Sequence, residues 1–207
     1  AMLRIKGHHV VLDNVWLWRA DHDLNGKFPL HMYTKPPYYT NRVKNGLQVF
    51  GDHVSFYMLA VEHIIGDHVL WKGNFGRTYF YQCEFPYDLG PTSYAMNRFV
   101  SYHVVPSDAS RSGKKKVFQH DCRGLAVYSM FMDSDAAPAA AIQVPDVGTT
   151  KSGQNWIRVE HANTHQICCG GGIASVINGR GGGVGTKGGS DAFQSLIVTP
   201  GHTRYER

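Results

Sequence analysis

The feature that most constrains the fold is a short motif that recurs along the first third of the chain. The segments that begin at Gly7, Gly51 and Gly66 all read Gly-X-His-Val, and each opens an apolar run. Superposing the first two copies, at an offset of 44 residues, makes apolar residues coincide with the two-residue alternation of a β-strand. The coincident pairs are Ile5 with Val49, Val10 with Val54, Leu12 with Phe56, Val15 with Leu59, and Leu17 with Val61. Such self-similarity predicts a coiled stack of short strands.

The repeat predicts an all-β fold, a parallel β-helix or solenoid with long loops. An offset of 44 residues is about two turns of such a solenoid, so the three motif glycines should occupy equivalent turns and Val10 and Val54 one interior column. Residues 1–207 are expected to be a single β-helix domain, either whole or a fragment of a longer β-helix. The Gly-rich segment 170–189 is expected to form tight turns or a mobile loop. The long loops are expected at 21–44, 86–98 and 106–115.

Charge and hydropathy exclude several classes of protein. The net charge is +5, but apart from a short tract at 111–116 the basic residues are scattered, so a nucleic-acid partner is not expected. No run of ~18 apolar residues is present, so no membrane span is expected, and the first residues do not read as a signal peptide. The glycine-rich segment lacks a phosphate-binding pattern, and the histidines lack metal-site spacing, so we expect no cofactor and no metal site.

The four cysteines leave two alternatives open. Cys83, Cys122, Cys168 and Cys169 lack zinc-site spacing, and their even number permits two disulfides. All four are therefore disulfide candidates, and an oxidising compartment should leave at least one bond that includes Cys168 or Cys169. The alternative is four buried thiols.

Several sequence blocks within about residues 14–145 occur in an order that resembles a known family. They are Trp-Leu-Trp-Arg-Ala-Asp-His from Trp16, Val-Glu-His from Val61, Trp-Lys-Gly-Asn from Trp71, Gly-Arg-Thr-Tyr-Phe-Tyr-Gln from Gly76, and Gly-Leu-Ala-Val-Tyr-Ser from Gly124. The chain resembles secreted carbohydrate-active proteins that include α-1,3-glucanase-like glycoside hydrolases. This resemblance implies a right-handed parallel β-helix, a polysaccharide substrate and an extracellular location.

Two glutamates have the spacing that glycoside hydrolysis requires. Glu62 and Glu84 are 22 residues apart, about one coil, and each ends an aromatic-rich strand. Successive coils lie ~4.8 Å apart, which suits the ~5 Å between the carboxyls of a retaining glycosidase. Asp21 and Asp88 lie at the entries of nearby loops and complete the expected catalytic set. The alternative is that each acid caps a turn or pairs with an arginine.

Aromatic and planar polar side chains near these acids are candidates for sugar contacts. Sugars pack their C–H faces on aromatic rings and donate hydrogen bonds to planar groups. The expected substrate-binding residues are Trp18, Trp71, Arg77, Tyr87 and His63. Strand alternation splits such residues between two faces, so those that point inward would be core residues instead.

Two functions follow and both remain open. The first is an extracellular β-helix protein that binds a glucan, with hydrolysis by paired carboxylates as its expected chemistry. The second is a non-catalytic structural β-helix subunit that self-associates through its coil ends into a filament or sheath. The aromatic loop 21–44 favours the first, whereas the absence of an Asp-Asp dipeptide and an uncapped first coil favour the second.

Overall fold

The computed structural model describes residues 1–20, 43–87, 100–105, 119–131, 135–145, 155–185, 191–199 and 202–206. Strands and turns make up these residues, and no helix in them is long and apolar enough to cross a membrane. Most of the long loops expected from the sequence lie outside the described residues, as does the basic tract at 111–116.

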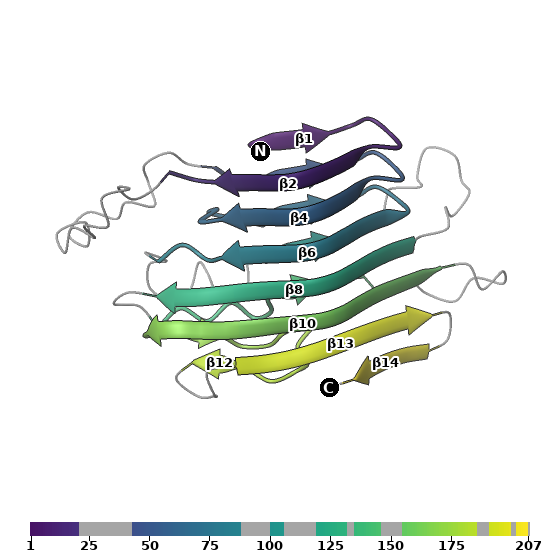
Figure 1. Cartoon of the computed structure of the whole chain (residues 1–207). Helices are drawn as coiled ribbons and strands as arrows, with labels where there is room; N and C mark the ends of the chain where they lie inside the picture. Colours follow the sequence, from purple (N-terminus) through teal and green to yellow (C-terminus); the bar gives the residue numbers. More distant parts are fainter. Residues whose placement is uncertain are drawn as a thin grey trace.

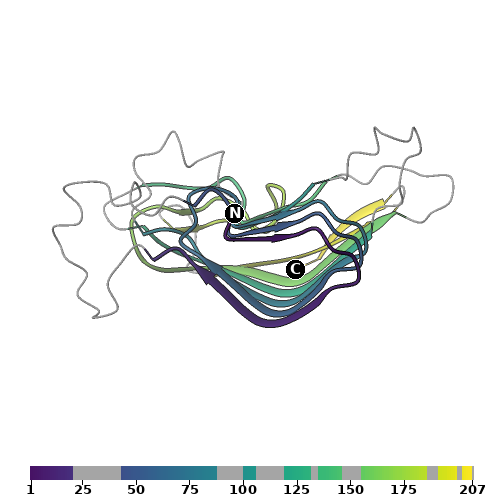
Figure 2. The same ribbon diagram turned by 90° about the horizontal axis from the view of Figure 1, so that it is seen from above.

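Two main sheets face each other across a shared core. The five-stranded sheet is parallel and contains, in order, β1 (Leu3–Ile5), β3 (Leu47–Val49), β5 (Val69–Trp71), β7 (Tyr102–Val104) and β9 (Ile142–Gln143). The seven-stranded sheet contains β2 (Val11–Trp18), β4 (Ser55–Glu62), β6 (Gly76–Glu84), β8 (Gln119–Phe131), β10 (Trp156–Cys169), β13 (Asp191–Thr199) and β14 (His202–Glu206). Because the chain alternates between the sheets, each pair of strands adds one layer to the stack (Figures 1 and 2). The fold is therefore all-β with parallel sheets, as expected.

The last strands depart from the layered pattern. β13 pairs antiparallel with β10, and β14 pairs antiparallel with β13, so a hairpin ends the seven-stranded sheet (Figure 1). In the described part of the Gly-rich segment, β11 (Gly172–Ile173) and β12 (Val184–Gly185) form a small antiparallel pair. Tight turns are thus confirmed for this part of the segment.

The strand register confirms the repeat residue by residue. Ile5 pairs with Val49, and Leu12, Val15 and Leu17 pair with the residues 44 positions later in β4. The interpretation of 44 residues as two turns is wrong, however, because β2 and β4 are direct neighbours. The next step, from β4 to β6, is 22 residues, so the first layer is longer by the segment that contains residues 21–42.

The first two motif copies occupy equivalent turns, but the third does not. A Cβ on Gly51 would lie 1.8 Å from the carbonyl oxygen of Gly7, and a Cβ on Gly73 would lie 1.8 Å from that of Gly51. Gly73 is therefore the third glycine of this column. Gly66 lies in a different turn, where its Cβ would be 2.2 Å from the oxygen of Lys44. The prediction that Gly66 shares the turn is wrong.

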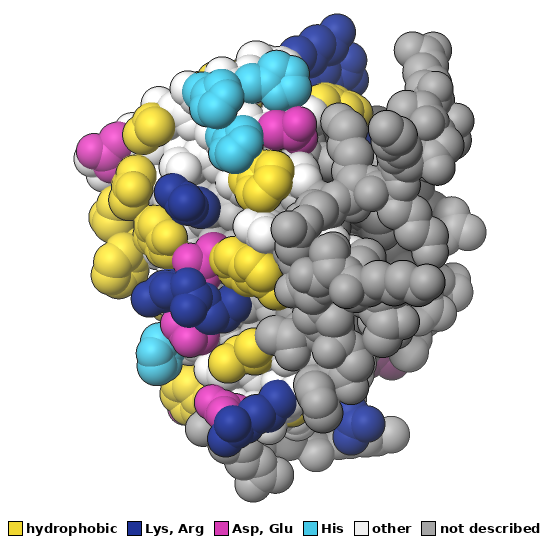
Figure 3. Space-filling view, turned by 90° about the vertical axis from the view of Figure 1, so that its right-hand side faces the viewer, with side chains coloured by type: hydrophobic (Ala, Val, Ile, Leu, Met, Phe, Trp, Pro, Cys, Tyr) yellow, Lys and Arg dark blue, Asp and Glu magenta, His cyan; other side chains and the backbone are white. Residues whose placement is uncertain are grey.

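The motif histidines differ in the same way as the motif glycines: the first two share a turn and the third does not. His9 and His53 both have left-handed backbone, with φ of 57°, and their rings stack at 4.6 Å. Phe75 continues the stack at 4.4 Å from His53. Figure 3 shows histidine side chains gathered at the top of the face that is turned toward the viewer. The third motif histidine, His68, is instead fully buried.

Close stacking of this glycine column gives a first prediction. Replacing Gly51 or Gly73 by alanine should lower the free energy of unfolding by about 1–3 kcal/mol, because the added methyl group meets backbone of the layer above. Gly7→Ala is the matched control, since a Cβ there meets only a Val10 methyl group at 3.4 Å. Urea denaturation measures all three variants. Equal stability of Gly51→Ala and Gly7→Ala would contradict the stacked column.

A second backbone column bends the seven-stranded sheet. One residue in each of its five parallel strands has φ between 52° and 67°: Asn14, Met58, Phe80, Gly124 and His161. The strand register is interrupted at these positions, because Asp13 pairs with Tyr57 and the next pair is Val15 with Leu59. Two successive side chains can then face outward, as Tyr57 and Met58 do at 43% and 53% exposure. We call this column the crease; the sheet curves in Figure 2.

The interior contains polar groups as well as apolar side chains. The Tyr102 hydroxyl lies 2.6 Å from Thr78 Oγ1 and 3.0 Å from His120 Nε2. His68 Nε2 accepts a hydrogen bond from the backbone N–H of Ile64 at 3.3 Å. Burial lowers the pKa of His68 and of His120 to about 3. Both histidines are therefore neutral in the folded protein at physiological pH.

These buried histidines predict acid sensitivity. In the unfolded chain each has an ordinary pKa, so between pH 6.5 and about 3 the unfolded state binds more protons and stability falls as pH falls. From pH 6.5 to 5 each should cost on the order of 2 kcal/mol. Urea titrations at pH 7 and pH 5 measure the loss, and His120→Gln should reduce it by about half. Undiminished stability at pH 5 would contradict this account.

Candidate functional site

One end of the seven-stranded sheet gathers polar and aromatic side chains. Strands β2, β4 and β6 end at paired residues, β8 and β10 continue past this level, and the residues that pair there form a column across successive strands. We call this set the terminal column: Trp18, Glu62, Glu84, Tyr128, His165 and Asp191. The column arises because the parallel strands keep one register from the crease to these residues; the register of β10 with β8 shifts only beyond them, between Gln166 and Cys168.

The two predicted glutamates are direct neighbours in this column. Glu62 at the end of β4 pairs with Glu84 at the end of β6. Trp16 Nε1 donates a hydrogen bond to Glu62 Oε2 at 2.6 Å, and His63 Nε2 lies 3.5 Å from Glu84 Oε2. Each carboxylate therefore has a nitrogen partner that comes from the preceding layer.

His63 supports this site from beneath the surface. Its residue is 1% exposed, and its ring lies edge to face with Tyr87 at 4.4 Å. The Nε of buried Arg19 donates a hydrogen bond to the His63 carbonyl at 2.5 Å. The expected role of His63 as a direct sugar contact does not fit this burial. We therefore describe it as a positioning residue for Glu84.

The far end of the column is polar as well. His165 Nδ1 lies 2.5 Å from Asp191 Oδ1, and the Tyr128 ring packs edge to face on His165 at 6.0 Å. No sequence pattern predicted a site role for these three residues. Their layers are separated by 44 and then 37 residues, so no constant offset aligns them with Glu84.

The other predicted site residues divide into four groups. Trp71 is a core residue with no exposure, in edge-to-face contact with Phe56 and His120, so its predicted sugar contact is wrong. Arg77 is exposed but lies at the opposite end of β6 from Glu84. Asp21 and Asp88 lie outside the described residues. Trp18 and Tyr87 are partly exposed, as a sugar contact requires.

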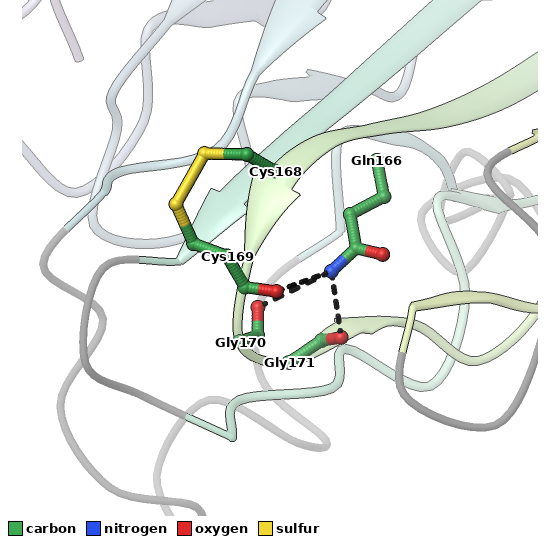
Figure 4. Close-up of a disulfide and its surroundings, with 5 residues drawn as sticks. All are labelled: Gln166, Cys168, Cys169, Gly170 and Gly171. Carbon is green, nitrogen blue, oxygen red and sulfur yellow. Dashed lines mark hydrogen bonds between the residues drawn. A yellow bond between two sulfur atoms is a disulfide. The ribbon is translucent and has the colours of Figure 1, made fainter.

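The cysteines resolve into one disulfide and two thiols. Cys168 and Cys169 are bonded to each other at the end of β10 (Figure 4). Gln166 Nε2 donates hydrogen bonds to the carbonyl groups of Cys169 at 2.9 Å and of Gly171 at 3.2 Å. The predicted disulfide that includes these adjacent cysteines is thus found.

Cys83 and Cys122 are wrong as disulfide candidates. Both are free and fully buried in the core, and burial raises the pKa of each thiol far above its ordinary value. The two thiols are not neighbours in the β6–β8 register. Cys122 lies beside Thr78, and Cys83 lies beside Val127. Their role is packing.

This cysteine chemistry predicts a definite thiol count. In denaturant without reductant, alkylation should modify Cys83 and Cys122 only, and reductant should expose two further thiols. In the native protein the two buried thiols should react slowly, because they are protonated and shielded. Peptide mass spectrometry identifies the modified residues. Four alkylated cysteines in unreduced, denatured protein would contradict the disulfide.

No metal centre is built from the described residues, because no three His, Cys, Asp or Glu side chains among them converge. The expected metal-free chemistry stays a prediction for the chain as a whole. Within the described part, the terminal column is instead an array of paired carboxylates, imidazoles and aromatic rings on a rigid sheet. Such an array suits a neutral polyhydroxylated ligand.

The fold and the site define a stack of parallel β-layers with an acidic and aromatic column on one face. Residues 1–84 match a family model described as the LAM55 pectate lyase-like domain. The chain is also similar to an exo-β-1,3-glucanase from Streptomyces sp. (strain SirexAA-E / ActE). The two are 29% identical over 143 residues, which are 68% of this chain and 21% of the glucanase. The chain therefore spans about a fifth of the length of this curated relative.

Solved structures show the same fold. The structure of sacteLam55A from Streptomyces sp. SirexAA-E has a TM-score of 0.68 and 22% identity, over 95% of this chain and 34% of that one. An ensemble refinement of a sacteLam55A variant in complex with glucose also gives 0.68, at 21% identity over 95% and 31%. The expected similarity to carbohydrate-active glucanases is confirmed. The α-1,3 subtype finds no support in these relatives, one of which is named a β-1,3-glucanase.

Proposed function

We propose that this chain is the glucan-binding part of an extracellular β-1,3-glucan hydrolase, built as a right-handed parallel β-helix. The observation that carries the proposal is the register of Glu62 with Glu84 on neighbouring strands. The similarity to an exo-β-1,3-glucanase supports the choice of linkage. The vicinal disulfide supports an oxidising compartment, since such bonds persist mainly outside the cytosol.

The spacing of the two carboxylates favours a retaining mechanism. Neighbouring strands lie ~4.8 Å apart, close to the ~5 Å at which one carboxylate attacks the anomeric carbon while the other protonates the leaving oxygen. Glu62 is our choice for the nucleophile because Trp16 Nε1 fixes one of its oxygens and leaves the other available. Glu84 is our choice for the acid and base because the His63 imidazole lies beside its carboxyl group.

Aromatic rings flank the two acids on the same face. Trp16 is 65% exposed, and its ring stacks with Trp18 at 6.2 Å. Tyr87 contributes a third partly exposed ring next to His63. Together these rings provide apolar surface for the C–H faces of a sugar, while the carboxylates accept hydrogen bonds from its hydroxyl groups.

Replacing either glutamate tests the catalytic proposal. Glu62→Gln and Glu84→Gln should each reduce sugar release from a soluble β-1,3-glucan by ~10³-fold or more, while binding persists because side-chain size is preserved. Glu206→Gln is the matched control, since Glu206 lies on edge strand β14 and pairs with Arg204. Reducing-sugar release is measured on β-1,3-, α-1,3- and mixed-linkage glucans. Thermal unfolding checks that each variant is folded.

Three outcomes separate the alternatives. Full activity in both variants would overturn the roles of Glu62 and Glu84. Release from the α-1,3-linked polymer alone would overturn the choice of linkage. No release from any polymer by the wild-type protein, together with self-association in analytical ultracentrifugation, would favour the structural subunit instead.

A further inference from the structure

A hollow of about 550 Å³ lies on the outer face of the seven-stranded sheet, away from the terminal column. Its lining residues are Tyr79, Phe80, Arg123, Gly124 and His161. Three of them belong to the crease: Phe80 on β6, Gly124 on β8 and His161 on β10. Because β8 lies between β6 and β10, Gly124 lies between the other two. The hollow exists because this one member of the crease has no side chain.

The upper wall of the hollow is aromatic. Phe80 is 70% exposed, which is unusual for a ring on an ordered strand and leaves one face open to a ligand. The adjacent Tyr79 is backed by Tyr57, whose ring lies 5.5 Å away. The Arg123 guanidinium lies 5.9 Å from the Tyr79 ring, within the range of a cation–π contact. The Tyr79 part of this wall is therefore packed between Tyr57 and the Arg123 guanidinium.

A network of charges fixes the polar wall. Arg158 donates two hydrogen bonds to Asp121, at 2.9 and 2.8 Å, and the Tyr79 hydroxyl donates a third at 3.0 Å. Arg123 lies 3.4 Å from both Asp121 and Glu160. Partial burial alone would raise the pKa of Asp121, but the bonds from Arg158 and Tyr79 and the charges of Arg158 and Arg123 hold it below its usual range.

The charges of this network cancel. Arg123 and Arg158 supply two positive charges, and Asp121 and Glu160 supply two negative charges. Arg77, which pairs with Asp121 in the strand register, adds one further positive charge nearby. The hollow itself presents the polar groups of Tyr79, Arg123 and His161 beside the exposed Phe80 ring. A neutral, polyhydroxylated ring with one apolar face meets both requirements.

We propose that this hollow is a second carbohydrate-binding site, which takes a neutral pyranose ring against Phe80. Phe80 precedes Glu84 by four residues, or roughly 13 Å along the strand at ~3.3 Å per residue, so the two sites are separate. The identity of the sugar as glucose rests on the proposed function, whereas the site itself rests on the geometry of the hollow.

Filling the hollow and removing its wall are independent tests. Phe80→Ala removes the ring on which the sugar packs. Gly124→Asn fills the space, and the backbone tolerates it, because Asn14 already occupies the crease with φ of 52° and a Cβ on Gly124 meets nothing closer than 3.7 Å. Met58→Ala is the matched control, since Met58 is an exposed crease residue outside the hollow.

Calorimetric titration with a β-1,3-linked glucose hexasaccharide measures binding, in a Glu62→Gln, Glu84→Gln background that cannot cleave it. Phe80→Ala and Gly124→Asn should each weaken one binding event about tenfold or remove it, and Met58→Ala should change nothing. In the active background, Phe80→Ala should leave the hydrolysis of a short soluble substrate unchanged. A folded Gly124→Asn variant keeps the test valid if Phe80→Ala fails to fold.

The outcomes are distinguishable from those of the first proposal. Unchanged binding in both Phe80→Ala and Gly124→Asn overturns the second site and leaves the catalytic proposal standing. Binding that depends on Phe80, in a protein that hydrolyses no glucan, supports the second site and overturns catalysis. Absence of any binding by the parent protein overturns the second site.

Discussion

The structure depends on in-register parallel pairing between successive layers. Each residue of a strand faces one residue in the layer above and one in the layer below, at the fixed spacing of β-strands. Side chains therefore form columns, and a column is stable only if its members tolerate close contact with one another. The glycines at 51 and 73, where a Cβ would strike the backbone of the neighbouring layer, show how strictly this rule acts.

The same rule has an energetic consequence at the terminal column. Pairing places the Glu62 and Glu84 side chains on neighbouring strands, an arrangement that repulsion between like charges disfavours. Trp16 and His63 offset this cost by contacting one carboxylate each. A stack whose only requirement was stability would not place two acids here, so the arrangement points to function rather than to folding.

Sequence patterns predicted strand contacts where a motif or an alternation recurs in neighbouring layers, and missed them where none recurs. The alternation shared by residues 5–17 and 49–61 predicted which residues of β2 and β4 align, although not that the two strands are direct neighbours. The 22-residue spacing placed Glu62 beside Glu84. Beyond residue 87 the layers differ in length, so the contributions of Tyr128 and His165 were hidden.

Trp71 shows a different limit of sequence reasoning. It ends the three-residue strand β5, where alternation turns both end residues toward the core, and three residues are too few for periodicity to reveal that direction. His68 and Gly66 were misplaced for a related reason. Their motif matches the first two copies in sequence, but it belongs to another turn of the layer, where a buried imidazole contacts the Glu84 carbonyl at 3.2 Å.

At the crease the backbone conformation is the same in every layer, whereas the side chain differs from layer to layer. A left-handed residue is present in each of the five parallel strands of this sheet, so the bend belongs to the architecture. The side chain at that position is not constrained in the same way, since asparagine, methionine, phenylalanine, glycine and histidine all occupy it. Because these side chains face outward, changing one alters the surface without disturbing the core. A single glycine between phenylalanine and histidine is thus sufficient to create a hollow on an otherwise continuous face.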